Sequence, residues 1–499
     1  MTRARARLIA LCGLLGVAAG APADASPLFE LWGAQGNGGH NARVLPGGAA
    51  STYFNPALLT EAEVDFDLGV AVVADQIGVR LRGRPSASAD LSVQSVDAER
   101  PGGGRYERYG LPTEWLQNGK PATPPDPSLA PRPRQGQGSG HQVRAYQLVG
   151  MVRKLLDDRL AVGLIAMIPY SEFTGAAAFY SDEREQYFSN SLHPELYADR
   201  LTATSLAFGA GGRLGDRLSV GASFTLALRT VAGTPTFLGD VGRFQDIMVD
   251  SDVGVKTAVA PHFGAALALT PATRLAATVH TPQKTEIGTD FSFLLPSGLE
   301  QRAQIRFTHA YLPWTVGLGV SHTLGGRPTE GVTLAATALY ARWSDYVDRH
   351  DQRPVAAYAW QNTISGVAGL RYRRGDGGLA LDVVYQPSPV PDQTGRTNYV
   401  DNDRVGAALS GTLAASAGRL RLLLSLSAQA HRLLPRETVK LPAGPAAEAR
   451  VLDEVPDDAV LAGDPLPGRG GLQTNNPGWP GFSSAGYVLG GGMNVGLQF

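Results

Sequence analysis

Residues 487–499 read YVLGGGMNVGLQF, and their hydrophobicity alternates along the chain. One set of alternate positions carries mostly large apolar side chains: Tyr487, Leu489, Met493, Val495, Leu497 and Phe499. The positions between them carry mostly small or polar residues such as Asn494 and Gln498. Because successive side chains of a β-strand point to opposite faces, this period of two predicts a strand with one apolar face.

The same period recurs upstream of this last segment. Residues 218–229 read LSVGASFTLALR, in which the apolar positions again alternate with small or polar ones. Residues 379–386 and 420–427 repeat the pattern. An apolar strand face is buried in a soluble β-sandwich but meets lipid in a membrane barrel. Periodicity therefore leaves both folds open.

The lengths of the connections favour the membrane barrel. Six short segments rich in Gly, Pro or Asp are predicted turns, at 156–158, 215–217, 271–273, 325–328, 375–377 and 417–418. Seven longer segments alternate with them, at about 85–140, 170–199, 232–252, 296–301, 346–357, 388–402 and 437–483. Transmembrane barrels alternate tight periplasmic turns with longer outer loops in this way. We therefore predict an all-β fold, a 14-stranded antiparallel transmembrane β-barrel over residues 62–499.

Residues 1–25 have the features of a signal peptide. Three arginines precede an apolar stretch, and Ala23-Asp24-Ala25 matches the small-x-small pattern of a cleavage site. We expect a mature chain that begins near Ser26 and is exported to the outer membrane of a Gram-negative cell. The single cysteine, Cys12, lies in this leader, so we expect no disulfide in the mature protein.

Residues 26–61 do not alternate and are rich in Gly and Ala. They precede the first predicted strand of a ring that is wider than the eight-stranded barrels whose side chains fill their own interior. We predict that this segment folds as a compact N-terminal plug inside the lumen, and that Phe54, Asn55, Pro56 and Ala57 belong to it. The alternative for these four residues is an ordinary turn into the first strand.

Several motifs resemble, in their order and spacing, the FadL/TodX family of outer-membrane transporters for long-chain fatty acids and other hydrophobic compounds. The N-terminal ones are SPLFE at 26–30, GGAAS at 47–51 and FNPA at 54–57. The C-terminal ones are LPW at 312–314, ARWSDY at 341–346, YQPSPVPD at 385–392 and DNDR at 401–404. The resemblance covers most of the mature chain. It implies the plug, which the Asn-Pro-Ala motif closes, and passive uptake of a hydrophobic small molecule.

The chain also departs from the family pattern. It lacks the acidic pair that often precedes the plug motif, and the loops at 85–140 and 437–483 are unusually long. These departures leave the fold intact and concern the ligand.

A carrier of hydrophobic ligands needs an apolar capture groove on its outer side, because burial contributes ~0.8 kcal/mol per methylene. The second long loop is rich in aromatic residues, and we take five of them as candidate ligand-capture residues: Phe173, Phe179, Tyr180, Tyr187 and Phe188. Alternatively, they form a small core of the loop itself or part of the interfacial aromatic girdle.

Three further residues are candidates for a role in transport. Pro169, near the end of the third predicted strand, is a candidate strand kink, because the family's ligand is thought to leave sideways through a kinked strand. A simple strand end is the alternative. Arg229 and Arg421 fall on the predicted lumen face and are candidate charges for a ligand carboxylate, unless they pair with strand acids such as Asp382.

Other function classes have weaker support. The nine histidines are scattered, with no zinc-protease, serine-hydrolase or phosphate-loop motif, so we predict no enzyme, cofactor or metal site. A formal net charge of −1 gives no reason to expect nucleic acid. A general aqueous porin and a structural or adhesive barrel remain rivals. We also expect contact with outer-membrane lipid and lipopolysaccharide, and with the outer-membrane assembly machinery through the terminal strand ending in Phe499.

Overall fold

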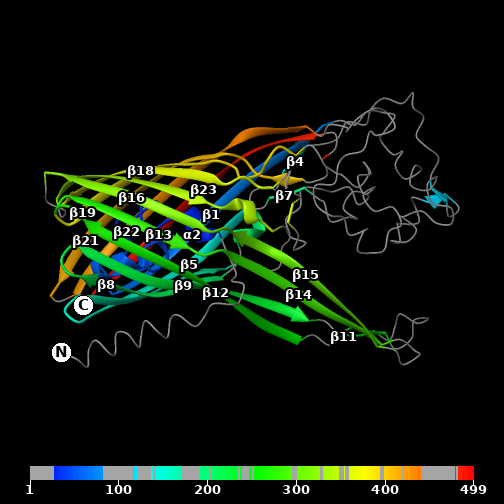
Figure 1. The fold of residues 1–499 in the computed structure, drawn as a ribbon, viewed down its shortest axis with the longest axis horizontal. Helices are drawn as coiled ribbons and strands as arrows, with labels where there is room; N and C mark the ends of the chain where they lie inside the picture. Colours follow the sequence, from blue (N-terminus) through cyan, green and yellow to red (C-terminus); the bar gives the residue numbers. More distant parts are fainter. Residues whose placement is uncertain are drawn as a thin grey trace.

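Figure 1 shows the fold as a computed structural model. The structure describes residues 27–82, 116–117, 120–121, 136–138, 142–170, 192–194, 196–201, 204–233, 236–238, 247–249, 252–294, 300–325, 330–347, 353–354, 359–393, 398–418, 420–439, 478 and 481–499. All structural statements below concern these residues.

Fourteen antiparallel strands of the described residues pair into one closed ring. The ring closes because β23 pairs with β1, from Phe66 opposite Leu497 to Leu81 opposite Phe482. In ring order the strands are β1 (Phe66–Leu81), β5 (Gln142–Leu155), β6 (Leu160–Pro169), β8 (Thr204–Leu214), β9 (Leu218–Gly233), β12 (Asp252–Ala268), β13 (Thr273–His280), β16 (Thr315–Leu324), β17 (Gly331–Ala341), β18 (Thr363–Arg374), β19 (Gly377–Gln386), β21 (Arg404–Ala417), β22 (Leu420–Val439) and β23 (Gly481–Gln498). The predicted fourteen-stranded barrel is confirmed.

The two ends of the ring differ in their connections. The short connections, after β5, β8, β12, β16, β18 and β21, lie at one end, which we call the turn end. The C-terminus lies there too, at the left of Figure 1. The opposite end, which we call the loop end, carries the longer connections. In the first turn Leu156, Asp157 and Asp158 all have positive φ, a conformation that Asp tolerates better than most residues.

One long connection contains more structure than its sequence predicts. Where a loop at 296–301 is expected, β14 (Gln283–Leu294) and β15 (Glu300–Leu312) form a separate hairpin between β13 and β16, which extends past the ring in Figure 1. The alternation in the sequence does not separate the hairpin strands from the ring strands β13 and β16. Only two residues lie between β13 and β14, and only two between β15 and β16. Shorter strands complete the described set: β2 (Leu116–Gln117), β3 (Lys120–Pro121), β4 (Gly136–Gly138), β7 (His193–Pro194), β10 (Thr236–Leu238), β11 (Ile247–Val249) and β20 (Tyr399–Val400).

The ring has an apolar outer face and a polar inner face. On β9, Leu218 and Val220 are exposed, whereas Ser219, Ser223 and Thr225 are buried. Exposed apolar side chains on other strands include Val72, Met151, Val162, Phe263, Leu318, Leu334, Ile364, Leu381, Leu409, Leu426 and Met493. A water-soluble sandwich has the opposite arrangement, so this belt suits contact with lipid.

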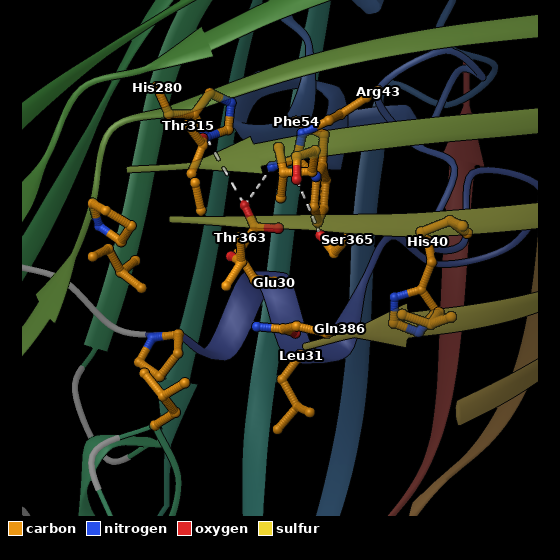
Figure 2. A pocket seen from close by; sticks show the side chains of 18 of the residues that line it. Glu30, Leu31, His40, Arg43, Phe54, His280, Thr315, Thr363, Ser365 and Gln386 are labelled. Atoms are coloured by element: carbon orange, nitrogen blue, oxygen red, sulfur yellow. Dashed lines mark hydrogen bonds and ion pairs between the residues drawn. The ribbon is translucent and has the colours of Figure 1, made fainter. Parts of the chain in front are cut away.

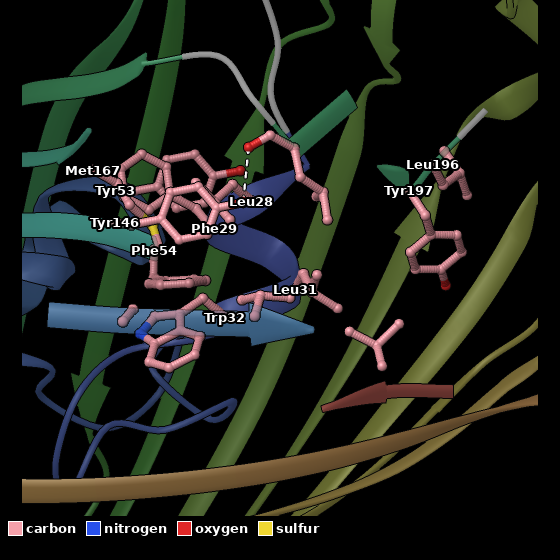
Figure 3. Close-up of a cluster of buried hydrophobic side chains, with 14 of the residues drawn as sticks. Leu28, Phe29, Leu31, Trp32, Tyr53, Phe54, Tyr146, Met167, Leu196 and Tyr197 are labelled. Carbon is pink, nitrogen blue, oxygen red and sulfur yellow. Dashed lines mark hydrogen bonds between the residues drawn. The ribbon is translucent and has the colours of Figure 1, made fainter. Parts of the chain in front are cut away.

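The segment before β1 lies inside the ring (Figure 1), and we call residues 27–65 the plug. It contains α2 (Leu28–Trp32), η1 (Gly48–Ala50), α3 (Ser51–Phe54) and η2 (Pro56–Glu61); two more 3₁₀ turns, η5 (Ala198–Leu201) and η6 (Trp343–Asp345), belong to loop-end connections. Figure 3 shows Phe29, Trp32 and Phe54 of the plug packed with Tyr146 and Met167 of the wall. Burying each such side chain stabilises the docked plug by ~1.5 to 3 kcal/mol.

No helix among these residues combines the length and the apolar character that a membrane crossing requires.

Candidate functional site

A cavity of about 110 Å³ lies on the loop-end side of the plug, and we call it the upper cavity (Figure 2). Its floor comes from the plug and its wall from the strands between β12 and β21. A second cavity, of about 340 Å³, lies on the turn-end side, and we call it the lower cavity. Since plug residues line both, the plug lies between the two cavities.

Apolar side chains form much of the wall of the upper cavity. They come from the plug, from the segment before β8 and from the loop ends of β15 and β17: Leu31, Phe54, Leu196, Tyr197, Leu312, Pro313, Leu339 and Trp343. Leu312, Pro313 and Trp343 belong to motifs that carry the family resemblance. Such a wall favours an apolar ligand because it removes the ligand's surface from water.

The floor of the upper cavity contains a buried ion pair. Arg43 donates to Glu30 Oε1 at 2.5 Å, and the hydroxyl of Tyr53 donates to the same oxygen at 2.9 Å. Burial by itself would raise the pKa of Glu30, but the Arg43 guanidinium and the Tyr53 hydroxyl hold it below its ordinary value. Glu30 is therefore ionised at neutral pH and neutralises Arg43. His280 Nδ1 lies 3.9 Å from Glu30 Oε1.

Arg404, the first residue of β21, is the other cation in this cavity. Its side chain is buried, at 5% exposure, and donates to Gln386 Oε1 at 2.5 Å. Its Nε has no hydrogen-bond partner, and no carboxylate of the described residues lies within 4.0 Å of it. By contrast, the buried wall arginines Arg144 and Arg371 each pair with an aspartate. Arg404 is thus a buried cation that retains capacity to bind an anion.

An aromatic cluster lies beside the upper cavity toward the loop end. Its members are Tyr311, Trp343, Tyr346, Trp360 and Tyr399. Tyr346 and Trp360 stack with ring centroids 3.5 Å apart, and the rings of Trp360 and Trp343 are tilted at 43° with centroids 5.4 Å apart. This cluster joins residues far apart in sequence and gives the cavity a rigid apolar margin.

The plug motif is held by hydrogen bonds and by close backbone packing. Asn55 caps η2 by accepting from the Ala57 backbone N–H at 3.1 Å, and its side-chain amide donates to the Arg43 carbonyl at 2.7 Å. Pro56 and Ala57 lie against Gly221 of β9, where an added Cβ would come within 2.6 Å of the Ala57 nitrogen. Glycine is therefore required there for the wall to approach the plug.

A second anchor ties the plug to β18 and β19. Asp382 pairs with Arg371 at 2.8 Å, and it also accepts from the backbone N–H of His40 at 2.8 Å and from the Asn41 amide at 2.7 Å. Arg371 in turn donates to the Gly38 carbonyl at 2.9 Å. One wall ion pair thus satisfies several polar groups of the plug, as buried polar groups require.

Arg421 faces the lower cavity and not the upper one. Its nearest carboxylate is Asp376 in the β18–β19 turn, 3.7 Å away. Two other arginines around this cavity are also paired: Arg373 binds Glu63 at 2.5 Å, and Arg274 binds Glu61. Asp376 is a turn residue and not one of the strand acids that the sequence offered as partners, and a role of Arg421 toward a ligand stays a prediction.

The other predicted residues lie in several places. Arg229 is in β9, opposite Lys256 of β12, but its side chain is outside the described part of the structure. The five candidate ligand-capture residues lie wholly outside the described residues: Phe173, Phe179, Tyr180, Tyr187 and Phe188. Pro169 is the last residue of β6, and its pairing with β5 runs to Tyr146 with no register shift. It ends a strand and interrupts no ladder within the described β6. Sideways exit at this point stays a prediction.

Alternation of side chains did not identify Arg404, although the residue belongs to a motif that carries the resemblance. Period two assigns a residue to the lumen face but not to a depth along the barrel. The signal in the sequence that could have identified Arg404 was its position directly after Asp401-Asn402-Asp403, at the start of a strand. Among the described residues, no cluster of three His, Cys, Asp or Glu is arranged to hold a metal ion.

Comparisons with known proteins return solved structures only. No protein-family model and no curated protein matches the chain. A FadL homologue of Pseudomonas aeruginosa is 14% identical over 96% of this chain and 98% of its own, with a TM-score of 0.49. The toluene transporter TodX of P. putida is 12% identical over 95% and 99%, with a TM-score of 0.47. The toluene transporter TbuX of Ralstonia pickettii is 10% identical over 95% and 99%, with a TM-score of 0.43. Because these identities and TM-scores are low, the assignment of the fold depends on the strand pairing described above and not on these matches.

Proposed function

We propose that this protein takes up hydrophobic small molecules passively across the outer membrane of a Gram-negative cell, and that its ligands carry an acidic head group, as long-chain fatty acids do. The observation that carries the proposal is Arg404, a buried guanidinium without a described carboxylate partner in an apolar-walled cavity. The apolar outer belt supports the location. The turn end then faces the periplasm and the loop end faces the exterior.

The two parts of such a ligand contribute differently to binding. Each methylene moved from water to the apolar wall contributes ~0.8 kcal/mol, so the part of the chain that the wall covers supplies much of the affinity. A hydrogen bond to a charged group contributes ~1.5 to 3 kcal/mol, enough to orient the head. Arg404 therefore selects the head group, and the wall sets the overall affinity.

The size of the upper cavity constrains the transport step. At about 110 Å³ it is smaller than the ~150 Å³ apolar cavity that accommodates benzene in another protein. It therefore holds the head group beside Arg404 with the adjoining carbons of the chain, and passage of the whole ligand requires movement of the plug or of a loop. A lumen that contains a packed plug opposes the general-porin alternative, which needs an open aqueous path.

Binding measurements on the purified protein in detergent test the head-group assignment. Arg404→Gln should weaken binding of palmitate about tenfold, because one charged hydrogen-bonded contact is lost, while binding of hexadecanol should be unchanged. Arg404→Lys should restore part of the palmitate affinity. Arg421→Gln is the matched control, since Arg421 faces the lower cavity.

Two outcomes would contradict the proposal. Equal losses for palmitate and hexadecanol would show that Arg404 acts on the fold and not on the head group. Unchanged palmitate binding in Arg404→Gln would remove the assignment of an acidic ligand. Uptake of labelled palmitate by cells that express each variant should follow the same order as the affinities.

A further inference from the structure

The outer wall of the barrel carries a groove that the proposed transport does not use. It has a volume of about 370 Å³ and crosses four neighbouring strands, β5, β6, β8 and β9. The small residues Ala210 and Ala222 line it together with larger apolar neighbours. Those neighbours are Met151, Val162, Leu164, Phe208 and Phe224.

An aromatic pair forms the side of the groove toward the loop end. Phe208 and Phe224 stack there with ring centroids 5.7 Å apart. On β8, Phe208 lies two residues farther from the turn end than Ala210, and on β9, Phe224 lies two residues farther than Ala222. Residues two apart share a strand face, so each Phe is next to its Ala on the outer wall. The groove therefore runs from this aromatic pair toward the turn end.

A cation lies at the other end of the groove. Arg153 lines it, is exposed, and is two residues from the end of β5, directly opposite Val162 of β6. Within the described residues it has no hydrogen-bonded side-chain partner and no carboxylate within 4.0 Å, even though Asp157 and Asp158 follow in the turn. Its charge is therefore available to an outside partner.

The depth of Arg153 agrees with the head-group region of a bilayer. Two residues of strand span ~7 Å, and a tilt of ~40° reduces this to ~5 Å from the turn end. The groove beyond it lies among the exposed apolar side chains of the belt. At this depth a lipid presents a phosphate to Arg153 and an acyl chain to the groove.

We propose that this groove is a binding site for one phospholipid of the inner leaflet, with an acyl chain between Met151 and the Phe208–Phe224 pair and the phosphate on Arg153. Lipid tails are as apolar as the groove, so burial alone gives it no advantage over the surrounding bilayer. Its concave shape and the Arg–phosphate contact supply the preference. The site is outside the lumen, so it stands apart from the ligand of the upper cavity.

Native mass spectrometry of the full-length protein can test this site with two added probes, a phosphatidylglycerol and a diacylglycerol with the same chains. The unmodified protein should retain one phosphatidylglycerol in preference to the diacylglycerol. Arg153→Gln should lower phosphatidylglycerol retention about fivefold, the effect of one cation at a membrane surface, and leave diacylglycerol retention unchanged. Ala222→Leu, which fills the groove, should lower retention of both probes.

Matched controls come from β18, where Arg374 is an exposed cation at the turn end and Ala368 an exposed small residue, both away from the groove. Arg374→Gln and Ala368→Leu should leave retention unchanged. Equal losses in the Arg153 and Arg374 variants would overturn the proposal, as would retention that Ala222→Leu does not affect. Detection of a second copy of the chain in place of the lipid would also overturn it.

Discussion

At the scale of single residues, several polar groups of the plug are paired with polar groups of the wall. Asp382 accepts from Arg371, His40 and Asn41, and Asn55 bonds both the plug backbone and the first turn of η2. Because an unpaired buried polar group costs ~1 to 3 kcal/mol, such contacts specify one position for the plug. The contrast with Arg404, which lacks an acidic partner in the described part, is what marks that residue as a candidate for ligand binding.

Glu30 should make plug docking sensitive to acid. Glu30→Gln removes the carboxylate from buried Arg43, and we expect a loss of about 2 kcal/mol at pH 7, seen as a lower Tm in detergent, because a buried donor is left unsatisfied. The folded pKa of Glu30 lies below 4.5, so its stabilising contribution is fully present above that pH and is lost as pH falls through the folded pKa. The Tm difference between wild type and variant should therefore shrink below about pH 4.5.

Glu437→Gln is the control for this prediction. Glu437 pairs with Arg82 at 2.9 Å, but both side chains are exposed, at 71% and 43%. An exposed pair contributes ~0 to 1 kcal/mol, so this variant should differ little from wild type at any pH. A Tm difference for Glu30→Gln that stays constant from pH 7 to pH 3 would contradict the assigned role.

At the scale of elements, η2 docks against a wall that glycine makes smooth. Gly211, Gly221 and Gly264, from three adjacent strands, all face residues 55–57 closely. The turns and strand faces were predictable because they depend on local turn residues and on period two. The β14–β15 hairpin was not, since a strand that leaves the ring keeps the same alternation as one that stays in it.

Gly221→Ala should displace η2. The added Cβ meets backbone atoms of Pro56 and Ala57, which cannot move without shifting the plug, so we expect a destabilisation of ~1 to 3 kcal/mol. Gly366→Ala in β18 is the matched control, because a Cβ there meets nothing within 4 Å. Thermal unfolding measures the loss, and planar-bilayer recordings should show current fluctuations in the first variant only. Identical behaviour of the two variants would contradict close docking of the motif.

At the scale of the whole molecule, the closed ring separates a lipid-facing exterior from a polar lumen, and the plug divides that lumen into two cavities. This arrangement opposes free diffusion of water-soluble solutes along the barrel axis. It leaves a small cavity with a largely apolar wall on the loop-end side.

Removal of the plug should turn the barrel into an open channel. Deletion of residues 27–61, with the leader and residues 62–499 retained, leaves a fourteen-stranded lumen without its filling, and rings of this width enclose water. Planar-bilayer recordings should show a large steady current for this variant and none for the full chain. Deletion of residues 445–470, within a predicted outer loop, is the control and should leave the current low. A large steady current from the unmodified protein would instead support the porin alternative.

The amino-acid sequence by itself determined the class of the fold, the number of ring strands, their inner and outer faces and the presence of a non-alternating N-terminal segment. These features follow from neighbours in the chain, through period two and turn chemistry. Only the tertiary structure decided which lumen residues meet, since His40 and Asp382 are 342 positions apart and meet because the plug docks on β19. It likewise placed Arg421 at the lower cavity and Arg404 at the upper one, because depth along a strand depends on register around the closed ring and not on alternation.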